Sequence, residues 1–130
     1  SEEATMRFSM ADLRALGETT FETETIWTNG NQVFTGVPLA AVVERFEVAE
    51  GVLEASAVND YMVEIPVSDA VQGGPIIAYE RNGQTMSLRN KGPLWIVYPY
   101  DSNPSAYKNE RTYSRSIWQL DRLRIVANVD

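Results

Sequence analysis

The chain contains no cysteine and no histidine, and these two absences exclude several classes of site. Without cysteine there is no disulfide, no thiol nucleophile and no thiolate ligand for a metal. Without histidine, a serine or cysteine triad in its usual form cannot be assembled. A structural zinc site is nearly excluded as well, because only carboxylates remain as strong ligands. The lack of cysteine fits an oxidising or a reducing compartment equally well.

The chain also lacks an apolar run long enough to span a bilayer, so we expect no membrane insertion. Its 130 residues suffice for one hydrophobic core, and residues 1–130 are predicted to form a single domain. The sequence starts at Ser1 without an apolar leader, from which we expect that an export signal has been removed.

Positive charge is scarce in the first part of the chain. Residues 1–80 carry three Lys or Arg residues against fourteen Asp or Glu residues, whereas residues 81–130 carry eight against four. A basic C-terminal part on an acidic chain indicates either a local anion site or a surface of salt bridges to the acidic part. Nucleic acid is not expected as a partner, because its polyanionic backbone would meet the acidic remainder of a small protein.

Two segments carry the signals of helices. Ser9 and Asp12 predict a capping box at the start of a helix over residues 10–16, which Gly17 ends. Pro38 suits the first turn of a second helix, because its missing N–H has no helical partner there. The apolar residues of this second helix recur on one face: Leu39, Val42, Val43 and Phe46.

Most of the remaining chain is predicted to be strands and turns. The Asn82-Gly83 pair between residues 76–81 and 84–88 indicates a hairpin. Further strands are expected at residues 20–28, 32–35, 52–58, 61–66, 94–98 and 120–129. Residues 100–112 are polar and rich in turn formers, which predicts a functional loop. The sum is a strand-dominated α+β domain with two or three short helices.

Six of the thirteen aromatic residues lie between Trp95 and Trp118, interleaved with basic side chains. Flat rings beside fixed cationic donors can hold a planar, hydrogen-bonding or anionic small molecule. We expect the two tryptophans to be core residues on adjacent strands. Three tyrosines of the polar loop are harder to bury together: Tyr100, Tyr107 and Tyr113.

The arginines of the same segment allow two interpretations. Arg111 and Arg115 are four residues apart, so they could cover one side of a pocket. The alternative is a structural salt bridge to the acidic N-terminal part. For Glu22 and Glu24, which share one face of a strand, a solvated edge is favoured over a catalytic carboxylate pair. No phosphate loop or dinucleotide fingerprint is present.

Four segments, in order along the chain, resemble the motifs of one family. They are Trp27-Thr28 with Phe34-Thr35-Gly36-Val37-Pro38-Leu39, Asn59-Asp60-Tyr61 with Ile65-Pro66 and Asp69-Ala70, Gly92-Pro93-Leu94-Trp95-Ile96-Val97-Tyr98-Pro99, and Ser116-Ile117-Trp118-Gln119-Leu120. They are similar to the "W…F-x-G-V-P-L", "D-G-Y…I-P…D-A", "G-P-L-R-L-V-x-P" and "W-x-L" segments of the oxidoreductase molybdopterin-binding domain family. The resemblance implies the sulfite-oxidase-like fold, an α+β domain with strand-dominated mixed sheets.

The chain departs from the family's pattern at three positions. The family's enzymes hold molybdenum through a cysteine in the strand before the tryptophan, and that position falls near Thr23 here. The arginine of "P-L-R-L" is Trp95, which removes one phosphate or pterin contact. The glycine of "D-G-Y" is Asp60, which a turn tolerates. We therefore do not expect molybdenum as a cofactor.

The resemblance leaves a pterin pocket. A pterin is planar and presents an amide-like edge, so it requires stacking rings with paired donors and acceptors. On the family's pattern the pocket is lined by polar and basic side chains, with Tyr61 and Trp27 as candidates for its walls. The candidate pterin-binding residues are Trp27, Asn59, Asp60, Tyr61, Asn90, Lys91, Tyr107, Arg111, Arg115 and Ser116.

The family includes small periplasmic proteins that lack the cysteine, bind pterins and signal to membrane-bound cyclic-diguanylate enzymes. The resemblance thus implies a non-catalytic periplasmic protein that binds a pterin-type ligand and reports its occupancy to a membrane sensor. One alternative is a molybdopterin-dependent oxidoreductase or redox subunit, which holds the metal without cysteine or uses a partner's redox centre. The other is a degenerate interaction domain in which Tyr107, Tyr113 and Arg115 pack into a closed core.

Overall fold

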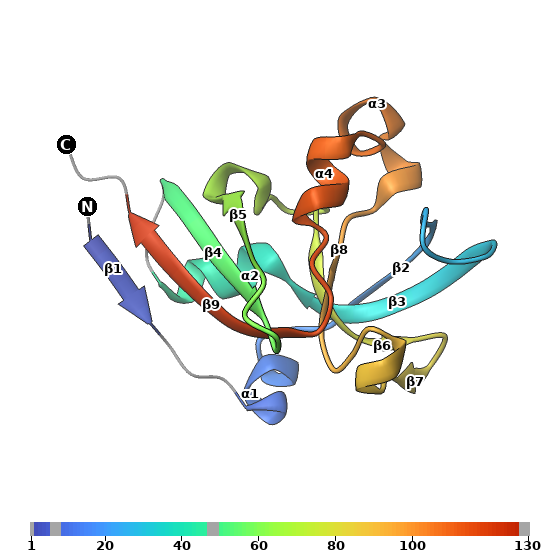
Figure 1. Ribbon diagram of the computed structural model, residues 1–130, viewed down its shortest axis with the longest axis horizontal. Coiled ribbons are helices and arrows are strands. Elements are labelled where there is room, and N and C mark those ends of the chain that lie inside the picture. The colour runs from blue at the N-terminus through green and yellow to red at the C-terminus, as the bar shows by residue number, and fades with distance from the viewer. Residues whose placement is uncertain (1, 6–8, 47–49, 128–130) are drawn as a thin grey trace.

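The computed structural model describes residues 2–5, 9–46 and 50–127, which form two sheets with short helices around them (Figure 1). The first sheet contains, in order, β1 (Glu2–Thr5), β9 (Leu120–Ala127), β4 (Gly51–Ala57) and β5 (Met62–Pro66). The second contains β2 (Thr19–Glu24), β3 (Asn31–Pro38), β6 (Ile76–Arg81) and β7 (Gln84–Thr85), with β8 (Trp95–Val97) also paired to β6. The predicted fold class, a strand-dominated α+β domain with short helices, is confirmed.

The two predicted helices are present. Helix α1 (Met10–Ala15) begins with the expected capping box, in which Asp12 N donates to Ser9 Oγ at 3.0 Å and Ser9 N donates to Asp12 Oδ2 at 2.9 Å. These hydrogen bonds hold the pKa of Asp12 below its usual value. Helix α2 (Leu39–Arg45) buries the predicted apolar face. Pro38 is instead the last residue of β3, because its ψ of 134° is that of extended chain.

The region predicted as a loop contains helical turns: η3 (Tyr100–Ser102), α3 (Pro104–Tyr107) and α4 (Glu110–Arg115). Each is too short to show a helical period in the sequence. Pro104 begins α3, and the Asn109 side chain caps α4 by accepting from Thr112 N at 2.8 Å. Figure 1 shows α3 and α4 next to each other at the top of the view, near β8.

Several strand bounds differ from the predictions. Strand β2 ends at Glu24, because residues 25–28 form a turn in which the Thr25 and Thr28 hydroxyls lie 2.7 Å apart. The hairpin between β6 and β7 is confirmed, with φ of 53° at Asn82 and 81° at Gly83, but β7 has two residues and η2 (Leu88–Asn90) follows it. Strand β1 was not predicted from the sequence, because its four residues form a strand by pairing with the distant β9.

The segment Phe34-Thr35-Gly36-Val37-Pro38 runs along β3 and packs closely on β6. The register between these strands shifts between Thr35 and Gly36. A Cβ atom at Gly36 would lie 2.1 Å from the Ile77 carbonyl oxygen, so only glycine fits. At the β4–β5 turn, Asp60 has a φ of 69°, a conformation that aspartate adopts more readily than most residues. The turn therefore accommodates aspartate at the position of the family's glycine.

The core lies around β8. Trp95 is fully buried, with its ring centre 5.2 Å from that of Phe34, as predicted for a core residue. Trp118 forms an isolated β-bridge with it but is only partly buried and lies outside any strand, so the prediction of a core position is wrong for Trp118. Of the three loop tyrosines, Tyr100 is fully buried and donates from its hydroxyl to Ser116 Oγ at 2.6 Å, whereas Tyr107 and Tyr113 are partly buried. No helix in the residues that the structure describes is long and apolar enough to cross a membrane.

Candidate ligand-binding site

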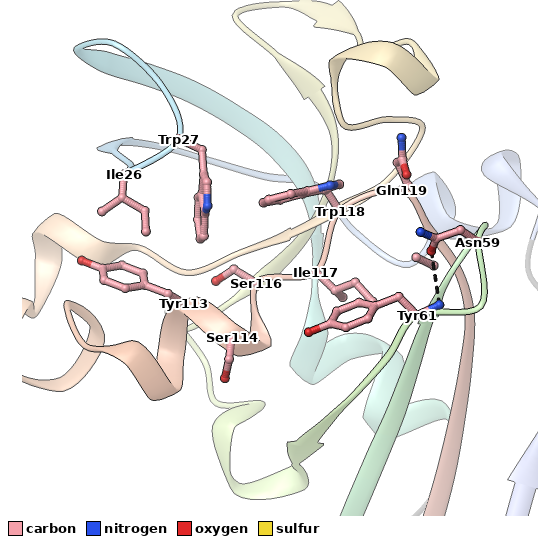
Figure 2. Close-up of a pocket in the computed structure, with 11 residues that line it drawn as sticks. Ile26, Trp27, Asn59, Tyr61, Tyr113, Ser114, Ser116, Ile117, Trp118 and Gln119 are labelled. Atoms are coloured by element: carbon pink, nitrogen blue, oxygen red, sulfur yellow. Dashed lines mark hydrogen bonds between the residues drawn. The ribbon is translucent and has the colours of Figure 1, made fainter.

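A cavity of about 520 Å³ opens where three segments distant in sequence meet (Figure 2). The β2–β3 turn contributes Ile26 and Trp27. The β4–β5 turn and its preceding residue contribute Ala57, Asn59 and Tyr61. The chain from α4 to β9 contributes Tyr113, Ser114, Ser116, Ile117, Trp118 and Gln119. This volume is within the range of cavities that hold small organic ligands.

Trp27 is the centre of the aromatic wall. Its ring centre lies 5.5 Å from that of Trp118 and 5.7 Å from that of Tyr113, both edge to face. It also meets Trp95 at 5.9 Å and Tyr100 at 6.3 Å. Such contacts are favourable and fix ring orientation. The wall is therefore anchored to the buried core through Trp95 and Tyr100.

Trp118, the second indole of the wall, is held from the η2 side. The Lys91 amine lies 4.9 Å from the centre of the Trp118 ring, within the range of cation–π attraction. Gln119 N donates to the Lys91 carbonyl oxygen at 3.0 Å, which ties the residue before β9 to the residue after η2. The Gln119 side chain donates to the Leu88 carbonyl at 2.7 Å. Lys91 is not a lining residue, so it supports the wall from outside the cavity.

Several polar groups of the lining have no hydrogen-bond partner in the part of the chain that is described, among them the Asn59 amide nitrogen and the Tyr61 and Tyr113 hydroxyls. The Asn59 side-chain oxygen accepts from Tyr61 N at 3.2 Å, which orients the amide. Figure 2 shows the amide nitrogen turned toward Trp118. By contrast, the Ser116 hydroxyl is already used, since it accepts from Tyr100 and donates to the Thr112 carbonyl at 3.0 Å.

None of the lining residues of this cavity is Asp, Glu, Lys or Arg. Arg115, at the end of α4, pairs instead with Asp69 at 2.9 Å, and Tyr98 donates to the same carboxylate at 2.9 Å. Burial, followed by the Asp69 charge, raises the pKa of the Tyr98 phenol. Of the two roles left open for Arg115, the structure shows the salt bridge to the acidic N-terminal part.

A second cavity, of about 310 Å³, adjoins the first and shares Ile26 and Tyr113 with it. Its other lining residues are Glu24, Thr25, Thr28, Gly30, Tyr100 and Lys108. Lys108 Nζ lies 2.8 Å from Asp101 Oδ1, and this contact lowers the pKa of Asp101 and raises that of Lys108. The second cavity is therefore polar, whereas aromatic and aliphatic surface dominates the first.

A comparison with protein families assigns the chain to a family. The family model for the oxidoreductase molybdopterin-binding domain matches residues 2–103. The chain belongs to this family. A comparison with curated proteins found no match. The family match ends before α3, so the cavity wall from Tyr113 to Gln119 lies beyond the matched residues.

The donor set does not fit the metal-bearing cofactor of this family's enzymes. That cofactor carries a phosphate, and the larger cavity has no cationic side chain to hold one. Within the described ranges, no group of three or more His, Cys, Asp or Glu residues is placed to hold a metal. The position of the family's arginine is the buried Trp95, which presents no cation.

Thr23, at the position of the family's cysteine, serves a structural contact instead. Its side chain is buried and is not part of either cavity lining. The hydroxyl donates to the Glu24 carbonyl at 3.1 Å and accepts from Asp101 N at 3.1 Å. Thr23 therefore fastens η3 to the end of β2.

The ten candidate residues divide into two groups. Trp27, Asn59, Tyr61 and Ser116 meet around the larger cavity. The other six lie outside it: Asp60, Asn90, Lys91, Tyr107, Arg111 and Arg115. Asp60 pairs with Arg122, Asn90 and Arg111 are exposed, and Tyr107 packs 5.5 Å from Tyr98.

The candidate list missed seven lining residues: Ile26, Ala57, Tyr113, Ser114, Ile117, Trp118 and Gln119. Tyr113 and Trp118 belong to the aromatic segment, which is a signal that the sequence did contain. Ile26 is 60% exposed and precedes Trp27 in a turn. An apolar residue beside an aromatic one in a turn was a weaker signal of a binding site. Ser114 and Gln119 are polar like many other residues of the chain, and Ala57 and Ile117 are small or aliphatic, so none of the four stood out in the sequence.

Proposed function

We propose that this chain is a non-catalytic protein that binds a pterin-type ligand and reports its occupancy to a membrane sensor in the periplasm. The observation that carries the proposal is the larger cavity, which combines aromatic walls with unpartnered polar groups such as the Asn59 amide nitrogen and has no charged residue in its lining. A pterin ring presents flat surface together with amide-like donors and acceptors, which match these two features.

The lining favours binding over catalysis. The larger cavity offers no carboxylate, amine, imidazole or thiol to act as an acid, base or nucleophile. The open cavity also disfavours the alternative of a degenerate interaction domain with a closed core, because Tyr113 lines the cavity and Arg115 pairs with Asp69. No structural observation favours the oxidoreductase alternative.

The β4–β5 turn is our candidate route for signalling. Asn59 and Tyr61 line the cavity, while Val58, Tyr61 and Met62 expose apolar surface on the same turn. A ligand that engages Asn59 therefore acts on residues next to a surface that a partner protein can cover. A membrane protein with a periplasmic sensory domain encoded beside this chain supports this half of the proposal, and the absence of any exported sensor from the host contradicts it.

A titration of intrinsic tryptophan fluorescence with reduced and oxidised pterins tests the binding half. We expect saturable quenching, because Trp27 and Trp118 form the wall. Asn59→Ala removes an amide from the cavity and is expected to weaken binding by about tenfold, the order of effect for one lost hydrogen bond to the ligand.

Asn90→Ala is the matched control, because it removes the same amide from an exposed position outside the cavity. We expect this variant to bind like the parent protein. A folded parent protein that binds no pterin contradicts the proposal, and equal losses in the two variants contradict the assigned cavity.

A further inference from the structure

The second cavity lies beside the one that we assign to the ring of the ligand. It adjoins the first through Ile26 and Tyr113. Figure 2 shows these two side chains at the end of the first cavity opposite Asn59 and Gln119. A ring held by Asn59 thus has its far end directed toward the shared boundary. The first cavity alone is large enough for a two-ring heterocycle.

The chemistry of the second cavity differs from that of the first. The Thr25 and Thr28 hydroxyls lie on its edge, 2.7 Å from each other, and each keeps capacity for another hydrogen bond. The Glu24 carboxylate is exposed and has no ion pair among the described residues. These groups accept hydrogen bonds from hydroxyl or amino substituents.

The charge balance of this cavity opposes a phosphate. Its one cation, Lys108, is held at 2.8 Å by Asp101, so the pair is close to neutral. The Glu24 carboxylate then sets the net charge of the lining. Glu22, two residues earlier on the same exposed face of β2, adds to the negative potential.

We propose that the second cavity binds the side chain of the ligand and selects an uncharged, hydroxyl-bearing substituent over its phosphate ester. The inference rests on the proposed function, since it assigns the substituent of a ring that occupies the first cavity. On this proposal the ligand of this chain differs from the cofactor of the family's enzymes in two ways. Its side chain carries no phosphate, and the chain has no cysteine to bind a metal.

Calorimetric titration with neopterin and with its monophosphate ester tests the inference, because the two probes share the ring and the hydroxylated chain. We expect the ester to bind about tenfold more weakly than neopterin at low salt, the order of effect for one like charge at a partly exposed site. Added salt should reduce this difference in affinity, because it screens the repulsion between the phosphate and the Glu24 carboxylate.

Glu24→Gln removes the negative charge of the second cavity. We expect it to bring the dissociation constants of neopterin and its monophosphate ester closer together. Glu22→Gln is the matched control, with the same change on the same strand outside the lining. A smaller change in the control supports the assignment to the second cavity, and equal changes in both variants overturn it. Equal or tighter binding of the ester by the parent protein overturns the inference and leaves the proposed function intact. Failure of both probes to bind overturns the two together.

Discussion

The replacement of Arg115 by Met separates a structural arginine from a ligand-binding one. Arg115 and Asp69 are about one-fifth and one-quarter exposed, and Tyr98 donates to the same carboxylate. Exposed ion pairs contribute about 0–1 kcal/mol, whereas loss of one partner of a buried pair costs about 3–5 kcal/mol. We therefore expect Arg115→Met to lower the free energy of unfolding by about 1–2 kcal/mol, since Met keeps most of the apolar stem.

Urea denaturation followed by circular dichroism measures this loss, and Arg111→Met is the control. Arg111 lies on the same helix but is exposed and has no ion pair in the described residues. We expect the free energy of unfolding of Arg111→Met to differ from that of the parent protein by no more than about 0.5 kcal/mol. Ligand affinity should be unchanged in both variants at a temperature where both are folded. If Arg115→Met kept the parent protein's free energy of unfolding but lost ligand affinity, while Arg111→Met lost neither, the structural role of Arg115 would be refuted.

Two further predictions concern buried groups around the site. Thr23→Val removes the hydroxyl that links the Glu24 carbonyl and Asp101 N, and we expect a loss of about 1–2 kcal/mol in urea denaturation, which an unchanged midpoint contradicts. Burial raises the pKa of the Tyr98 and Tyr100 phenols above their usual 10.0, so both should stay protonated at pH 11 while the fold persists. The free energy of unfolding should then fall as the pH rises above 10, because the unfolded chain releases protons that the folded chain keeps. An ultraviolet titration in which all six tyrosines ionise near pH 10 in the folded protein contradicts this prediction.

The parts of the fold that the sequence predicts are those set by neighbouring residues. Ser9 and Asp12 form their capping box within one turn of helix. Asn82 and Gly83 both adopt positive φ, which is what a two-residue hairpin requires of them. In each case the side chains that decide the geometry lie within a few positions of one another. A local pattern was therefore sufficient.

The cavity could be predicted only in part, because it joins three segments that are far apart in the sequence. The family resemblance pointed to Trp27, Asn59 and Tyr61, which lie within the matched residues. Its closing segment also pointed to Ser116, but it gave no role to Tyr113, Trp118 or Gln119, and all four residues lie beyond the residues that the family model matches. Whether Arg115 faces a ligand or a carboxylate depends on the position of Asp69, 46 residues away. No pattern in the sequence fixes such a distance.

The identity of the bound ligand can be determined directly by analysing the small molecules and metals that the protein carries when it is purified from its native host. Mass spectrometry of the released small molecules and metal analysis are made on the same folded sample. We expect a metal-free, unphosphorylated pterin, released in substoichiometric to equimolar amount. Stoichiometric molybdenum with a phosphorylated pterin would contradict this expectation.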